Sequence, residues 1–249
     1  MSTINPYVPP AGSSSRPPPP PPAVPPQPGS SLDFGRTLGF FFQDPNWVQK
    51  ILIGSLFTIL SFFFIGTIFV AGYIVRLIRR AARGEPYPLP EWDDLGGMFA
   101  EGLSAVGAYL IHIVPVVAIF LMSFVPLILL GERDGEPPPA ALLLFFPLMI
   151  VAIVILFAVM FYFTAAFTRL AVEERFGAAL EVQLNVAFLK RNAINFLLAV
   201  VAFMVANFIA QFGILLFCVG ILPATFWSQC VAAYALGDVA FRDPGSHRS

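Results

Sequence analysis

The chain has 249 residues, of which 57% are hydrophobic and 12% are charged, whereas a soluble globular domain is about 25% charged. This composition leaves too little polar surface for a soluble domain, and the formal net charge of −1 gives no basic field that would attract nucleic acid. Asp, Glu, Lys and Arg are absent from residues 51–75, 103–131, 137–168 and 192–237. An apolar stretch of about 18 residues or more can cross the hydrocarbon core of a bilayer. The sequence therefore predicts an integral membrane protein.

Residues 1–31 form a segment that holds half of the 24 prolines, including an unbroken run at 17–22. This composition favours the polyproline II conformation and disorder. We predict a disordered Pro-rich cytoplasmic tail. Its role is left open between a tether and a ligand for the groove of a protein partner, because a preformed polyproline helix loses little entropy on binding.

Residues 32–242 are predicted to form a helical membrane domain. It starts with a short amphipathic helix over 31–47, which we expect to lie in the headgroup layer with Trp47 as an interfacial anchor. The stretch 51–75 has two interpretations, a single tilted span or a short hairpin of 48–64 and 67–82 hinged near Gly66. We favour the hairpin because it keeps Arg16, Arg36 and Lys50 on the same side as the later arginines.

Three further uncharged stretches predict membrane-spanning helices: two single spans and one pair. Residues 104–130 contain Pro115 and Pro126, where kinks are expected, and residues 140–168 follow after a charged loop. Residues 193–211 and 214–236 are predicted to pair tightly around Gly213, and residues 243–249 form a short polar tail. The predicted fold class is an all-α, polytopic transmembrane helix bundle of five or six membrane segments with interfacial amphipathic helices.

Basic residues collect in the loops after 75 and after 168 and beyond 236, whereas the loop 131–139 has one Arg among three acidic residues. Because cytoplasmic loops collect Lys and Arg, we predict a multi-pass protein of the cell membrane. Its C-terminus and N-terminus are expected in the cytoplasm, and the loop 131–139 outside.

A cluster of charged and aromatic residues surrounds the turn that follows 51–75. In one interpretation, the arginines stop the transfer of the chain across the membrane, and the carboxylate of Asp93 or Asp94 caps the next helix. The other is recognition of anionic lipid headgroups, because each basic residue near such a surface contributes about 1 kcal/mol. The candidate interfacial, lipid-facing residues are Trp47, Tyr73, Arg76, Arg79, Arg80, Arg83, Glu91, Trp92, Asp93 and Asp94.

A second candidate site lies inside the membrane. Ala202, Ala206 and Ala210 recur every four residues, and small residues at that spacing let helices approach closely. Polar residues beside this stripe and on the next span suggest either interhelical hydrogen bonds or a polar pocket. The candidate pocket residues are Asn207, Gln211, Thr225 and Gln229.

Several short motifs resemble the domain-of-unknown-function 4013 family of bacterial and archaeal membrane proteins. The most specific is Leu89-Pro90-Glu91-Trp92-Asp93-Asp94, and the others, which extend the resemblance over about residues 41–242, are Asp44, Trp47, Lys50, Gly72-Tyr73, Arg76, Glu101-Gly102, the Gly237 region and Arg242. The chain departs from the family where members often have a Pro and Asn break, at 62–67, and where many have Asp in place of Glu101. The resemblance implies a membrane location and a fold, but no activity.

HExxH, GxSxG, Walker A and CxxC patterns are absent from the sequence. We therefore predict no catalytic, cofactor-binding or metal-binding residue and no enzyme activity. Two functions remain. The first is a non-enzymatic membrane scaffold or interaction protein that contacts the lipid bilayer and a protein partner. The alternative is a transporter or permeation protein for a small uncharged or hydrophobic solute.

Overall fold

The computed structural model describes residues 31–130, 135–215 and 220–243, and within these ranges the secondary structure is helical, with no strand. The Pro-rich tail, the loop residues 131–134 and the polar tail beyond Asp243 lie outside the described residues. The elements are α1 (Phe34–Gly39), η1 (Phe40–Gln43), α2 (Trp47–Leu60), η2 (Ser61–Phe63), α3 (Ile65–Ala82), α4 (Leu95–Met122), α5 (Val125–Leu130), α6 (Pro139–Glu173), η3 (Phe176–Leu180), α7 (Val182–Arg191), α8 (Ala193–Gln211), η4 (Phe212–Leu215) and α9 (Ile221–Arg242).

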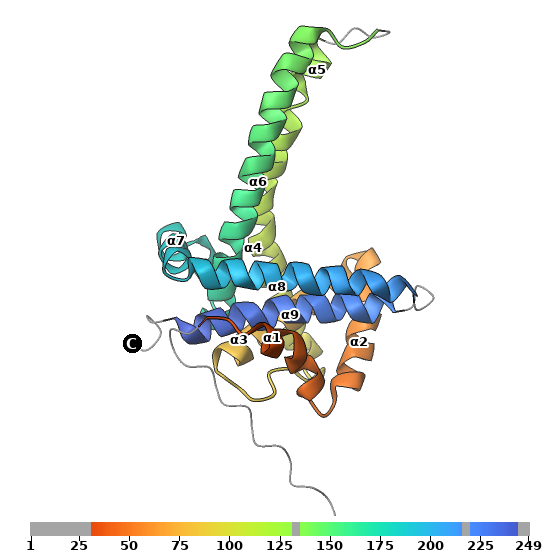
Figure 1. Cartoon of the computed structure of the whole chain (residues 1–249), viewed down its shortest axis with the longest axis vertical. Coiled ribbons are helices and arrows are strands. Elements are labelled where there is room, and N and C mark those ends of the chain that lie inside the picture. The colour runs from red at the N-terminus through yellow and green to blue at the C-terminus, as the bar shows by residue number, and fades with distance from the viewer. Residues whose placement is uncertain (1–30, 131–134, 216–219, 244–249) are drawn as a thin grey trace, which may run out of the picture.

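The helices form two regions (Figure 1). The arm consists of α4, α5 and α6, which stand away from the rest of the molecule as a long hairpin. The base consists of the remaining helices, and in it α8 and α9 run side by side across the foot of the arm. Within the described chain, the loops that carry charged residues belong to the base, except for the loop at the tip of the arm.

Local sequence explains how α4 and α6, the two long helices of the arm, begin. The Asp94 carboxylate accepts a hydrogen bond from the Gly97 amide at 2.9 Å and so caps α4, as predicted. Helix α6 starts at Pro139, the last of three consecutive prolines, where a missing amide costs nothing. At 1.5 Å per residue, the 35 residues of α6 extend over about 52 Å, well beyond a hydrocarbon core of about 30 Å.

The stretch 51–75 is a hairpin of two helices, as we favoured, but the hinge lies two residues earlier than predicted. Phe64 breaks the helix with a positive φ of 61°. Gly66 instead allows the two helices to touch, since a Cβ there would collide with the Phe57 carbonyl and the Ser61 amide.

Glycine and alanine residues set the packing of the base. A Cβ on Gly72 would collide with the Met98 carbonyl, and one on Gly102 would collide with the Ile68 carbonyl, so the backbones of α3 and α4 are in direct contact. The predicted alanine stripe of α8 is fully covered, with Ala202, Ala206 and Ala210 buried. Helices α8 and α9 therefore form the close pair expected from the sequence.

Two expectations differ from the structure. In the described residues, three helices are long and apolar enough to span a membrane, or four if the bent pair 34–43 and 47–63 is one span, against the predicted five or six. The hinge at Phe64 shortens α2, three arginines end α3, and α9 carries several polar side chains. The apolar face of 32–47 is also not left to lipid, because Phe40 and Phe41 are buried and Phe40 stacks on Tyr234 of α9 at 4.2 Å.

Candidate functional site

Several of the residues that carry the family resemblance, Asp44, Leu89, Glu91 and Trp92, meet at one place in the base, around Lys50 of α2. The Lys50 ammonium pairs with Asp44 at 2.8 Å and with Glu91 at 2.7 Å, and donates to the Leu89 carbonyl at 3.0 Å. The side chains of Lys50 and Asp44 are each 4% exposed. This buried pair fastens the loop between α3 and α4 to the start of α2.

Aromatic rings hold the same loop from its other side. Trp92 stacks on Tyr73 of α3 at 4.4 Å and on Phe57 of α2 at 5.0 Å, and its indole N–H donates to the Lys50 carbonyl at 3.2 Å. The predicted headgroup anchor Trp92 is thus half-buried within the protein. Trp47 lies on the neighbouring surface and contacts Phe42 edge-on at 5.2 Å.

The four arginines of α3 and its C-terminus face acceptors of this chain. Arg76 pairs with Asp94 at 2.7 Å and with Glu101 at 3.2 Å. Because the backbones of α3 and α4 touch at Gly72 and Gly102, these side chains start close enough to pair. The pKa of Asp94 is lowered by the hydrogen bond from the Gly97 amide and by the Arg76 guanidinium.

Arg79, Arg80 and Arg83 extend this network to other connections. Arg79 and Arg83 both pair with Glu174 beyond α6, at 3.2 and 2.9 Å. Arg80 pairs with Glu85 and donates to the Leu89 carbonyl at 2.7 Å and to the Tyr87 carbonyl at 3.0 Å. The structure therefore brings the predicted cluster together, and each of its four arginines pairs with an acidic side chain of this chain. Asp93 lies exposed beside Glu91 and Trp92 on a shallow cavity of about 190 Å³.

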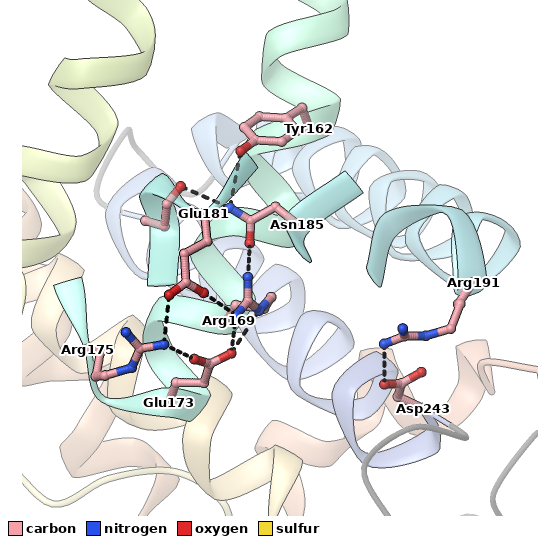
Figure 2. Close-up of polar contacts among 9 residues, drawn as sticks. Tyr162, Arg169, Glu173, Arg175, Glu181, Asn185, Arg191 and Asp243 are labelled. Atoms are coloured by element: carbon pink, nitrogen blue, oxygen red, sulfur yellow. Dashed lines mark hydrogen bonds and ion pairs between the residues drawn. The ribbon is translucent and has the colours of Figure 1, made fainter. Parts of the chain in front are cut away.

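A second polar network, which the sequence analysis did not single out, lies where α6 ends (Figure 2). Arg169 is mostly buried and donates to Glu173, to Asn185 at 2.9 Å and to Glu181 at 2.7 Å. Asn185 also donates to the Tyr162 hydroxyl at 3.1 Å. The sequence does carry a signal for this network: Arg169 is the first charged residue after the uncharged stretch 137–168, and Glu173 follows four positions later.

The acidic residue Glu181 closes this network from the start of α7. It accepts from Arg169 and, at 3.0 Å, from Arg175. Hydrogen bonds from the guanidinium groups of Arg169 and Arg175 lower the pKa of the Glu181 carboxyl. The network thereby ties α6, η3 and α7 into one unit at the foot of the arm.

The predicted intramembrane pocket is divided between two places. Gln211 donates to Asn207 at 3.3 Å within α8. Gln229 instead lines a cavity of about 250 Å³ together with Thr58, Ser61 and Thr67 of the first hairpin. Thr225 lies one turn earlier on α9, where its carbonyl accepts from Ser228. Within the described ranges, no group of three His, Cys, Asp or Glu residues is placed to hold a metal ion.

The fold and these networks define an α-helical membrane protein whose charges are gathered in one region. The sequence model described as "Protein of unknown function (DUF4013)" matches residues 55–219, more than half of the chain, and the chain belongs to this family. No curated protein and no solved structure matches the chain. The motifs at Asp44 and Lys50 and the region of Gly237 lie outside the matched residues.

Proposed function

We propose that this protein is a non-enzymatic scaffold of the cell membrane, anchored by the arm and presenting the base to partners. The observation that carries this proposal is the convergence of the chain's charged connections in the base. Arg242 donates to the Ser31 carbonyl at 2.8 Å, Arg191 pairs with Asp243 at 3.2 Å, and Glu174 pairs with the arginines of α3. Ser31, the last residue of the predicted tail, therefore lies beside the end of α9 and beside the junction of α7 and α8.

The ion pairs support a role in presentation because they fix connections to one another. Lys50 holds the loop after α3, Arg169 holds the start of α7, and Asp243 is held by Arg191 and Asn192. A surface whose connections are fixed in this way loses little conformational entropy when a partner binds. The bias of Lys and Arg toward these connections supports a cytoplasmic location for the charged connections of the base.

The test combines topology with partner capture in native membranes. Reporters at Ser14, Asp134 and Ser246 should give internal, external and internal signals. Cross-linking of the full chain, quantified by mass spectrometry, should recover partners that disappear when residues 2–30 are deleted and when the prolines at 17–22 are replaced by Ser. An external signal at Ser14, or an unchanged partner set in both variants, would contradict the proposal.

The cavity beside Gln229 supports a second candidate function, the permeation of a small uncharged solute. Its polar residues Thr58, Ser61, Thr67 and Gln229 lie between α2, α3 and α9, in a stretch without formal charge. Thr67→Cys and Gln229→Cys, in a background without native cysteines, should then react with a water-soluble thiol reagent. Phe208→Cys on the exposed face of α8 is the matched control. The control should not react, because the exposed face of α8 is apolar. If neither Thr67→Cys nor Gln229→Cys reacted, a water-accessible path through this cavity would be excluded.

A further inference from the structure

A cationic cavity lies at the junction of α7 and α8. It has a volume of about 460 Å³ and is lined by Ser31, Lys190, Arg191, Asn192, Ala193, Ile194 and Asn195. Lys190 and Arg191 are both exposed on its wall. Two adjacent cations at the start of an uncharged helix of 19 residues mark the level at which a lipid headgroup would meet the protein.

Arg191 differs from the buried arginines of the base in how its donors are used. Arg169 donates to three side chains, whereas the Arg191 side chain is 53% exposed and pairs with Asp243 at 3.2 Å. A guanidinium group carries five N–H donors in a planar fork that matches phosphate oxygens. Arg191 can therefore keep its contact with Asp243 and still offer donors to an anion in the cavity.

An apolar stripe begins at the cavity and continues along α8. Ile194 in the cavity wall is 74% exposed, and the exposed side chains that follow on the same face are Leu197, Val201, Val205 and Phe208. The spacing of three or four residues places these side chains in one row. From Ile194 to Phe208 this row extends over about 21 Å at 1.5 Å per residue.

We propose that this junction binds an anionic phospholipid. The headgroup phosphate occupies the cavity, where Lys190 and Arg191 donate to it, and the acyl chains lie along the exposed stripe of α8. The positive charge of the cavity favours an anionic headgroup. Because the cavity continues into the apolar stripe, the site favours a ligand that also carries hydrocarbon chains. The site is separate in the fold from the arginine cluster of α3, and it does not depend on the scaffold role.

The test uses the full chain in detergent micelles and native mass spectrometry with added phosphatidylglycerol, phosphatidylcholine or inorganic phosphate. Phosphatidylglycerol should bind most tightly, and the double variant Lys190→Gln/Arg191→Gln should weaken it by about 25-fold, about fivefold for each cation. Arg175→Gln is the matched control, because its side chain is 55% exposed but paired with Glu173 and Glu181. This control should bind as the unchanged protein does.

A second variant gives a change of opposite sign. Asp243→Asn removes the negative charge beside Arg191 but keeps an oxygen that can accept from Asn192, and it should tighten phosphatidylglycerol binding. Equal affinity for phosphatidylcholine, or unchanged binding by both the double variant and Asp243→Asn, would overturn the proposal. Binding of inorganic phosphate as tight as that of the lipid would overturn the lipid assignment and identify free phosphate as the ligand.

Discussion

The arm and the base have similar secondary structure but are held in different ways. In the arm, large apolar side chains such as Val154 and Phe157 are 62% and 70% exposed, and α6 packs against α4 and α5. In the base, helices are joined by buried ion pairs, stacked rings and backbone contacts at glycine. The difference indicates that the arm is suited to the hydrocarbon of a lipid bilayer by its exposed apolar side chains. The arrangement of the base depends instead on contacts between particular side chains.

The largest effect should come from breaking the buried ion pair of the base. Lys50→Ala leaves the Asp44 carboxylate buried without its cation and the Leu89 carbonyl without one of its donors. Loss of one partner of a buried pair costs about 3–5 kcal/mol. We expect the free energy of unfolding, measured by chemical denaturation in micelles, to fall by that amount.

The matched control replaces both partners. Asp44→Asn/Lys50→Met removes both charges and keeps most of the side-chain volume, so it should recover part of the loss seen in Lys50→Ala. If the single and the double variant were equally stable to denaturant, Asp44 and Lys50 would not act as a buried pair.

A charge in the arm should act on insertion rather than on internal contacts. Val154→Arg places a guanidinium group near the centre of α6, where the cost of insertion is about 2.5–3.5 kcal/mol. We expect less protein to resist alkaline extraction from membranes, whereas Val154→Leu should behave as the unchanged protein does. Full insertion of the Arg variant would show that this part of the arm faces water or another chain.

The same contrast explains what the sequence could predict. Uncharged stretches predicted the long helices of the arm, and a capping carboxylate predicted the start of α4, because each signal is local. The partners of Arg76 and the second network around Arg169 depend on which helices meet, and residue spacing within one segment does not contain that information. The headgroup interpretation of Trp92 likewise omitted Tyr73 and Phe57, which cover its ring from two other helices.

The backbone contact between α3 and α4 should tolerate no side chain. In Gly72→Ala the new methyl group would collide with the Met98 carbonyl, and overpacking of this kind costs about 1–3 kcal/mol. Gly107→Ala in α4 is the matched control, because its Cβ would lie 3.6 Å from the nearest atom of Phe176. The control should keep or raise the thermal midpoint, since Ala favours helix by about 1 kcal/mol over Gly, and a similar fall in both variants would contradict the close contact.

The smallest predicted effect is an acid sensitivity that comes from the second polar network, around Arg169. The pKa of Glu181 is lowered in the folded protein by Arg169 and Arg175. A lowered pKa stabilises the fold above the pKa of the unfolded chain, about 4.3 for Glu, and this stabilisation is lost as the pH falls through the folded value. The thermal midpoint should therefore decrease below about pH 4. Glu181→Gln should have a lower thermal midpoint at pH 7, and this midpoint should fall less on acidification. Glu136 is exposed at the tip of the arm, so the thermal midpoint of Glu136→Gln should follow that of the unchanged protein. Parallel pH profiles for all three proteins would show that the Glu181 ion pairs add nothing to the stability of the base.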